Sequence, residues 1–260
     1  MTLEIKREVD ALKKMYVENK AQDTGKFLVL GDSGTGKTRL ALTCPRPVLV
    51  HSFDPGGTKT LKSGIDEGWI IPDTRFEGEN DKQPTMYKVW EDEFNRLGKV
   101  GMFDHIGTYV LDSTTTWADA LMNNILKGSN RIGCKPEFED WRKLLDGCKY
   151  CMKQITNLPC HVLVTGHLTY EKDEADGRIR SSLAVSGQSA TKIPILFDEI
   201  YIMRPVPDTK GVRWRMQVSN DGKYTAATRM GNGKFELFEE PDIMKLFGKA
   251  GWDVKHKEIV

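Results

Sequence analysis

Residues 31–38 carry glycines, a lysine and a threonine at the spacing that phosphate binding requires. The run reads GDSGTGKT and fills every fixed position of the pattern G-x-x-x-x-G-K-T. Its glycines let the backbone curl so that N–H groups point inward at an anion. Lys37 is then placed to reach the β- and γ-phosphates, and the hydroxyl of Thr38 to bind Mg²⁺. The spacing predicts a site for a nucleoside triphosphate with Mg²⁺.

The flanking sequence is that of a strand, a loop and a helix, which is the context this motif needs. Apolar residues 27–30 suit a short buried strand, and the residues after Thr38 are good helix formers. A helix that begins there would add free N–H groups and the positive end of its dipole. An ordinary glycine turn is the less favoured alternative. We therefore expect nucleotide contacts from Gly31, Asp32, Ser33, Gly34, Thr35, Gly36, Lys37, Thr38 and Arg39.

Three more polar residues follow hydrophobic runs and are candidates for the chemistry of hydrolysis. Asp112 ends the run YVLD, so we expect it to hold the Mg²⁺ shell together with Thr38. Asp54 ends VLVHSFD and is the candidate for orienting the attacking water. His167 follows HVLVTG, at the strand end where α/β sheets bind ligands, and could sense the γ-phosphate. Structural alternatives are a helix cap for Asp112, a turn before proline for Asp54 and a purely structural histidine.

The composition is that of a folded protein that does not span a membrane. The chain has 260 residues, of which 39% are hydrophobic and 29% charged. Because no apolar stretch approaches the ~20 residues that cross a bilayer, and the N-terminus is amphipathic, we expect no membrane contact and a cytoplasmic location. Five cysteines argue against a disulfide framework. Cys148 and Cys151 lie in a helical apolar stripe, which favours core cysteines over a metal site.

Strands and helices are expected to alternate along the chain. Helices are predicted at residues 3–19, 85–97 and 137–158 and from Pro241 onward, strands at 27–30, 47–53, 108–111, 160–164 and 195–202, and a loop at 64–84. Asp221-Gly222 lies between two strand-like runs, 212–218 and 223–229, which predicts a hairpin. The expected fold class is α/β, with a mostly parallel central sheet flanked by helices and an antiparallel C-terminal hairpin.

The chain is expected to divide into two parts. Residues 1–20 form an amphipathic helix, which could act as an oligomerisation arm or pack on its own core, and residues 21–260 form the nucleotide-binding core with its C-terminal hairpin and helix. The charge is uneven, because residues 66–93 are acidic and residues 204–234 are basic. Such asymmetry can steer nucleic acid or let subunits stack, and an uneven solvated surface is the alternative.

The order of the motifs resembles the RecA-like branch of P-loop ATPases. GDSGTGKT, VLVHSFD, YVLDS and VLVTGH occur in the order of that branch, in which an acidic residue and a later Gln or His end two strands. The chain is most similar to short phage-encoded ATPases of the Sak single-strand-annealing type, and SGQSATKIPILFDEIYIM also looks like that group. The likeness spans about residues 26–237.

The resemblance implies a Mg²⁺-dependent ATPase that acts on single-stranded DNA in recombination or annealing. Its turnover would be stimulated by DNA, and it would be slow because Asp54 stands where recombinases have Glu. It implies a homo-oligomer, ring or filament, with ATP at subunit interfaces, in the host cytoplasm if a phage encodes it. A single-strand-binding protein is a further partner. DNA would bind loops at residues 128–135 and 168–192, with Tyr170 as a stacking residue; a long hairpin is the alternative for the second.

A second stretch, TAATRMGNGKFELF, is similar to the hairpin-tip motif of DnaB-type helicases. In that family a Lys and an Arg reach into the neighbouring subunit's ATP site. Arg229 keeps the arginine, but Ala227 stands where the lysine would be, and Lys223 or Lys234 could substitute. As an arginine finger Arg229 would make an oligomer obligatory; a surface arginine is the alternative. Two other functions stay open, a helicase or loader motor subunit and an ATP-gated interaction module with little hydrolysis.

Overall fold

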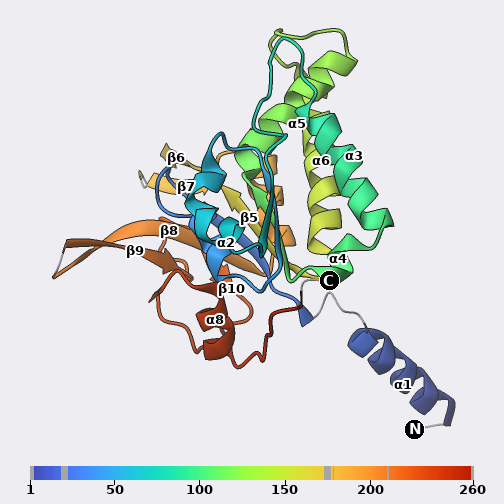
Figure 1. The fold of residues 1–260 in the computed structure, drawn as a ribbon, viewed down its shortest axis with the longest axis vertical. Coiled ribbons are helices and arrows are strands. Elements are labelled where there is room, and N and C mark those ends of the chain that lie inside the picture. Colours follow the sequence, from blue (N-terminus) through green and yellow to red (C-terminus); the bar gives the residue numbers. More distant parts are fainter. Residues whose placement is uncertain (1–2, 19–22, 173–176, 178, 210, 259–260) are drawn as a thin grey trace.

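The computed structural model describes residues 3–18, 23–172, 177, 179–209 and 211–258. A mostly parallel sheet forms its centre (Figure 1). The strands of this sheet are β1 Lys26–Gly31, β2 Val48–Ser52, β3 Ile70–Asp73, β4 Thr108–Asp112, β5 His161–Gly166, β8 Glu199–Asp208, β9 Gly211–Gln217, β10 Ala227–Thr228 and β11 Phe238–Glu239. Their order is β11-β9-β8-β1-β5-β4-β2-β3, and β10 pairs with β8. A separate hairpin consists of β6 Leu168–Lys172 and β7 Ile179–Leu183.

The predicted parallel strands are confirmed, and their sequences explain their central position. β1, β2, β4 and β5 are buried at every residue, as continuous apolar runs in parallel sheets are. β5 lies between β1 and β4, with Leu28 opposite Val164 and Val110 opposite Leu163. All four strands run in the same direction, so the residues that follow them meet at one edge of the sheet. This is the expected α/β fold with a mostly parallel central sheet.

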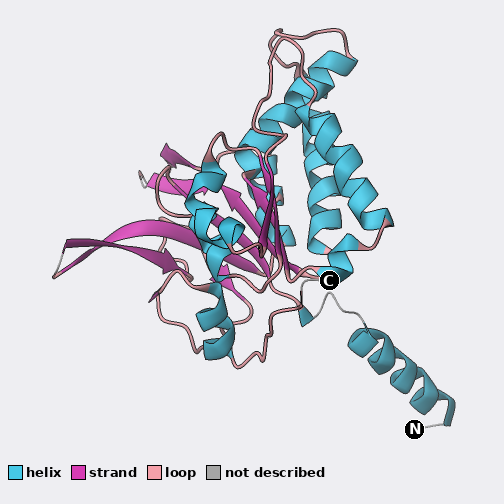
Figure 2. Ribbon diagram, viewed as in Figure 1, coloured by secondary structure: helices cyan, strands magenta, loops and turns pink. Residues whose placement is uncertain are grey.

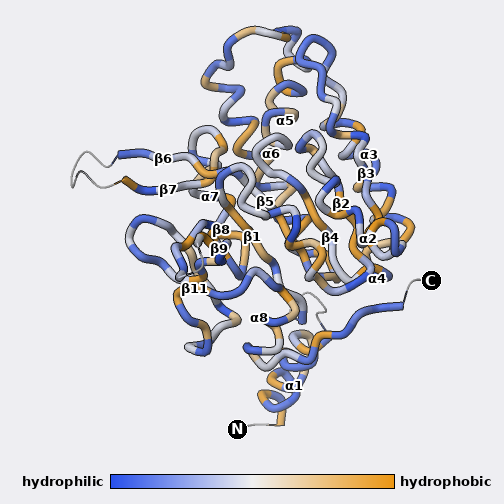
Figure 3. The backbone as a smooth tube through the Cα atoms, turned by 60° about the vertical axis from the view of Figure 1, so that its left-hand side comes forward, coloured by the Kyte–Doolittle hydropathy of each residue, from blue (hydrophilic) through white to orange (hydrophobic). Residues whose placement is uncertain are grey.

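Helices cover both faces of the sheet (Figure 2). They are α2 Lys62–Asp66, α3 Met86–Lys99, α4 Met102–His105, α5 Thr114–Gly128, α6 Phe138–Thr156, α7 Ser189–Lys192 and α8 Ile243–Ala250, with short 3-10 helices η2 Thr38–Thr43, η3 Gly57–Leu61 and η4 Pro194–Leu196. One face packs on α3, α5 and α6 through a core that includes Trp90 and Trp117. The other packs on η2 and α8 through Leu40 and Phe247. Figure 3 shows the hydrophobic residues concentrated in the central strands between these layers.

The predicted N-terminal helix is present as α1 Leu3–Glu18, and it extends away from the sheet (Figures 1 and 3). None of its residues is buried, and Leu3, Leu12 and Met15 are 64–72% exposed. The alternative that this helix packs on its own core is therefore wrong. Residues 1–2 and 19–20 of the predicted arm lie outside the described residues. Among the helices that the structure describes, none has the length and apolarity of a bilayer-crossing span.

The predicted C-terminal hairpin has a different turn from the expected one. β9 pairs with β8, from Ile202 opposite Gln217 to Asp208 opposite Gly211, so the hairpin closes upstream of Asp221. The Asp221 carboxylate accepts the backbone N–H groups of Lys223 and Tyr224 and makes a local turn there. The following segment returns to β8 as β10 rather than pairing with β9. The predicted pairing of 212–218 with 223–229 was wrong. A turn signal shows where the chain reverses but does not determine which strand each neighbouring segment pairs with.

Four element boundaries also differ from expectation. Residues 64–84 contain the edge strand β3, whose Pro72 suits an edge position, so they are not only a loop. The helix after the phosphate loop is a six-residue 3-10 helix, because Pro45 and Pro47 follow it closely. The last helix is capped by the Asp242 side chain, so it begins after Pro241 rather than at it. The strand predicted at 195–202 begins at Glu199, after η4.

Candidate active site

The phosphate loop follows β1 and has the conformation that its glycines predict. Gly34 and Gly36 have φ angles of 76° and 87°, which other residues rarely adopt. A Cβ atom at Gly31 would lie 2.7 Å from the Met203 carbonyl oxygen, so only glycine fits there. Lys37 Nζ donates to the carbonyl oxygens of Gly31 (2.9 Å) and Asp32 (3.0 Å). Burial lowers the pKa of Lys37, and the carboxylates of Asp112, Asp54 and Asp32 oppose that shift.

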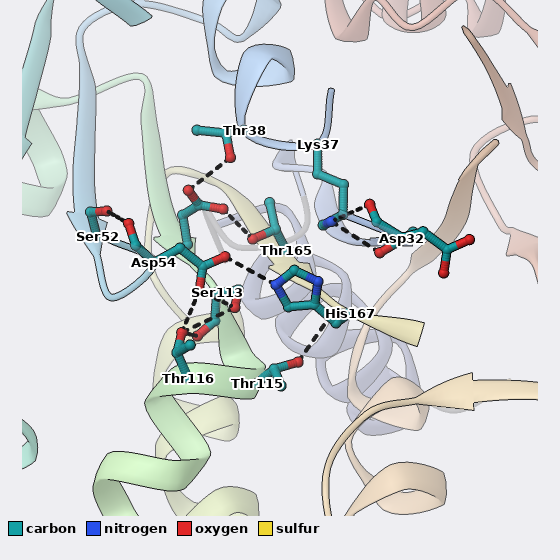
Figure 4. Close-up of polar contacts among 12 residues, drawn as sticks. Asp32, Lys37, Thr38, Ser52, Asp54, Ser113, Thr115, Thr116, Thr165 and His167 are labelled. Carbon is teal, nitrogen blue, oxygen red and sulfur yellow. Dashed lines mark hydrogen bonds and ion pairs between the residues drawn. The ribbon is translucent and has the colours of Figure 1, made fainter. Parts of the chain in front are cut away.

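Thr38 and Asp112 lie together, as the sequence predicted. Thr38 Oγ1 donates to Asp112 Oδ2 at 2.9 Å (Figure 4). The other carboxylate oxygen accepts a short hydrogen bond from Thr165 Oγ1. Asp112 is fully buried, and this burial raises its pKa. The nearby charge of Asp54 raises the pKa further, whereas the hydrogen bonds from Thr165 and Thr38 lower it. A carboxylate beside a hydroxyl is the hard-oxygen donor set that Mg²⁺ prefers, so these residues fit the ion.

Asp54 and His167 also meet at this edge of the sheet. Asp54 Oδ2 lies 3.2 Å from His167 Nε2 (Figure 4). Asp54 Oδ1 accepts hydrogen bonds from the hydroxyls of Ser113 (2.8 Å) and Thr116 (2.6 Å). Burial by itself would raise the pKa of Asp54, but the hydrogen bonds from His167, Thr116 and Ser113 outweigh it, so the pKa lies below its ordinary value. Asp54 is therefore an ionised, oriented acceptor at neutral pH.

The strand ends explain how these groups come together. Asp54 follows β2, Asp112 ends β4 and His167 follows β5, and the three strands are neighbours in the sheet. Hydrogen bonds between elements then hold the site, because the backbone N–H of His167 donates to Thr115 Oγ1 at 3.0 Å. The geometry brings the Asp54 carboxylate, the Asp112 carboxylate with its Thr38 contact, and the phosphate loop to one edge of the sheet, an arrangement that could support transfer of a phosphoryl group to water.

Sequence reasoning missed the hydroxyl residues that orient these carboxylates or hold the backbone of His167. They are Ser113, Thr115, Thr116 and Thr165. A signal was available, because the run DSTTT places four hydroxyls directly after Asp112 at the start of α5. Which of them faces Asp54 depends on the packing of α5 against the strand ends, and that packing has no local pattern.

Arg229 lies at the opposite end of the sheet from the phosphate loop. It follows β10, which pairs with the first residues of β8, and its guanidinium donates to Asp198 Oδ1 at 2.9 Å. Asp198 is bonded to the backbone of Lys26 at the start of β1, whereas the loop follows the end of β1. The six residues of β1, roughly 17 Å long at ~3.3 Å per residue, separate the two. Arg229 is therefore not part of the site in its own subunit.

Residues 168–183 contain the β6–β7 hairpin, as expected for a hairpin in the segment 168–192, and the predicted DNA contact of this segment stays a prediction. Tyr170 on β6 is half exposed, and its hydroxyl donates to the Asp32 carboxylate of the phosphate loop at 3.0 and 3.1 Å. The Lys223 ammonium lies 5.8 Å from the centre of the Tyr170 ring. The charged residues 173, 174, 176 and 178 of this segment lie outside the described residues. Cys148 and Cys151 are buried in the core, as expected.

Comparison with known proteins identifies the family. Residues 24–230 match the family AAA_24, described as an AAA domain. Among solved structures, the chain is similar to the KaiC-like protein PH0186 of the hyperthermophilic archaeon Pyrococcus horikoshii OT3, with 10% sequence identity and a TM-score of 0.42 over 75% of this chain and 78% of that chain. No protein with a curated description matches. Because the family match contains every residue of the site described above, the chain belongs to the AAA domain family of P-loop proteins.

Proposed function

We propose that the chain hydrolyses Mg²⁺-bound ATP and uses the cycle to act on single-stranded DNA in annealing or recombination. The observation that carries the first part is the cluster at the strand ends, where Thr38 contacts Asp112 at 2.9 Å and Asp54 contacts His167 at 3.2 Å. A P-loop with an adjacent ionised base supports hydrolysis better than nucleotide binding alone. The Sak-like order of motifs and the exposed hairpin beside the loop support the second part.

The residues divide the work of hydrolysis as follows. Lys37 and the loop N–H groups bind the phosphates and neutralise charge on the leaving ADP oxygen. Asp54 accepts the proton of a water as its oxygen attacks the γ-phosphorus and the bond to the bridging oxygen breaks. His167 holds Asp54 and lies where it can contact the γ-phosphate. Mg²⁺, when bound, supplies positive charge opposite the phosphate oxygens.

Contact between the hairpin and the phosphate loop supports a role for ATP in DNA binding. Tyr170 reaches Asp32, and Lys172 and Arg180 are exposed on the same hairpin. These cations and the ring of Tyr170 could neutralise and stack on a single strand. Residues 128–135 are a weaker candidate, because Arg131 is engaged in ion pairs with Glu137 and Asp140.

Two assays test the proposal. We expect phosphate release that depends on Mg²⁺, rises with oligo(dT) and falls at least 100-fold in Lys37→Ala. In fluorescence anisotropy at low salt, we expect the wild-type chain to bind a labelled oligo(dT) more tightly with ATP than without. ATP binding without turnover would indicate the ATP-gated module instead, and unwinding of forked DNA by a closed ring would indicate the helicase-type motor. Failure to bind single strands at low salt would exclude the DNA role.

Two features support a homo-oligomer with ATP between subunits. Arg229 is 67% exposed at the far end of the sheet from its own phosphate loop, so it can complete a site only in a neighbour. The exposed apolar residues of α1, including Leu12 and Tyr16, need a partner surface. We propose that α1 holds the adjacent subunit and that Arg229 enters its nucleotide site, in a ring or a filament.

Mixing two inactive variants tests the shared site. Lys37→Ala lacks a working loop but keeps Arg229, and Arg229→Ala has the opposite defect. If Arg229 acts in trans, mixed oligomers recover part of the ATPase rate, because some interfaces then carry both intact residues. Lys255→Ala serves as the control for loss of a basic residue outside this motif, since its side chain is 79% exposed. If the ATPase rate of the mixture is only the sum of the two variants' own rates, the shared site is contradicted. A second measurement tests α1: an unchanged mass in solution after deletion of residues 1–20 would contradict its role in holding the adjacent subunit.

A further inference from the structure

A cavity of about 290 Å³ opens beside the phosphate loop, on the face of the sheet that packs on η2 and α8. Residues from four parts of the chain line it, among them Gly36, Arg39, Leu42, Met203, Trp214 and Pro241. Its volume is close to the lower end of the ~300–1,000 Å³ range of small-molecule sites. None of the catalytic groups Asp54, Asp112 and His167 belongs to it, so the mechanism above leaves it unused.

The cavity shares its wall with the phosphate loop. Gly36 and Thr35 are residues of the loop itself, and Arg39 follows Thr38, which would hold Mg²⁺. A ligand whose phosphates lie in the loop must direct the rest of its body away from Asp54, where the γ-phosphate reacts. The cavity lies directly beside the loop and is large enough to take part of that body. Its position therefore suits the nucleoside end of a triphosphate.

Trp214 gives this cavity a specific recognition surface. It lies on β9, opposite Pro205, and alternation along the strand puts it on the same face as Met216. Met216 is fully buried in the core, whereas Trp214 is 44% exposed, so the indole is not needed to fill that core. An exposed indole in a cavity with apolar walls such as Leu42 and Met203 is a stacking surface for a flat ring.

We propose that this cavity binds the base of the nucleotide and that Trp214 stacks on it. The inference rests on the proposed binding of a triphosphate at the loop and adds how the base is recognised. Arg39 lines the same cavity, and its planar guanidinium can also lie against a base.

Stacking contacts the flat face of the base and leaves its hydrogen-bonding edge without side-chain partners. The two lining threonines are already engaged, because Thr35 Oγ1 donates to Asp32 O and Thr43 Oγ1 donates to Leu40 O. Thr43 Oγ1 also accepts the N–H of Ile243. A site that places few side-chain hydrogen bonds on the base edge discriminates weakly between bases of the same size. The cavity should therefore accept adenine and guanine with affinities that differ by less than about tenfold.

Competition binding with two ligands tests the proposal. The ligands are ATP and inorganic tripolyphosphate, which carries the phosphates without a base. We expect Trp214→Ala to weaken ATP binding by roughly tenfold, the loss of one stacked base, and to leave tripolyphosphate binding unchanged. Trp214→Phe should recover most of the ATP affinity because it restores a ring. Val212→Ala is the matched control, since Val212 lies on the same face of β9 and does not line the cavity.

The outcomes separate this inference from the proposed function. If the wild-type chain binds neither ligand, triphosphate binding itself fails. If it binds both and Trp214→Ala weakens neither, only the assignment of the cavity is overturned. Equal weakening of ATP and tripolyphosphate would also overturn it, because the effect would then come from the loop. A preference for ATP over GTP of 100-fold or more would contradict recognition by stacking.

Discussion

Replacing Asp54 with asparagine is expected to lower kcat for ATP hydrolysis by about 10²- to 10⁴-fold and to leave the Kd for ATP nearly unchanged. Asparagine keeps the shape of the side chain but cannot take a proton from water. The pKa of Asp54 lies below its ordinary value, because hydrogen bonds from His167, Thr116 and Ser113 outweigh the effect of burial. The wild-type carboxylate is therefore already ionised at neutral pH, and activity should be lost only as the pH falls below the ordinary range of an aspartate.

The measurement is single-turnover hydrolysis combined with equilibrium ATP binding. Asp73→Asn is a matched control, since Asp73 ends β3, the strand next to β2, and its carboxylate pairs with Arg75 outside the site. We expect the control to retain wild-type kcat. An Asp54→Asn enzyme with more than a tenth of the wild-type rate would show that another group activates the water and would remove Asp54 from the mechanism.

Most of the site could be predicted from the sequence because its residues are tied to local patterns. The phosphate loop is a contiguous motif, and Asp54, Asp112 and His167 each follow a recognisable buried strand. Parallel strands then bring their carboxyl ends to one edge of the sheet, whatever their exact order. The prediction needed only the direction of the strands and not the details of packing.

The features that the sequence did not predict depend on contacts between distant segments. Thr165 looks like any strand residue until β5 is placed beside β4, where its hydroxyl reaches Asp112. Trp214 reads as part of an alternating strand, and only the pairing of β9 with β8 brings it beside the loop. The hairpin prediction was wrong for the same reason. Asp221 does form a turn, but which strands pair depends on contacts with segments far away in the sequence.

Replacing Asp112 with asparagine is expected to have opposite effects on activity and on stability. The Asp112 carboxylate would hold Mg²⁺ through an anionic oxygen that asparagine lacks, so kcat should fall by about 10²- to 10³-fold. The asparagine amide can still be satisfied, because Thr38 and Thr165 carry hydroxyls that can donate or accept. Lys37 keeps the nearby carboxylates of Asp54 and Asp32 as compensating charges. The fold should therefore tolerate the substitution.

The gain in stability should depend on pH in a defined direction. Burial raises the pKa of Asp112, so the folded state keeps its proton to a higher pH than the unfolded state, and ionisation costs folding free energy. In EDTA, the unfolding free energy of the wild-type chain should therefore fall relative to Asp112→Asn as the pH rises from 3.8 through the raised pKa. Above that window the variant should melt at a higher temperature than the wild-type chain. A variant less stable than wild type at neutral pH without metal would contradict this account, because it would mean that the Asp112 charge contributes to folding and not only to Mg²⁺ binding.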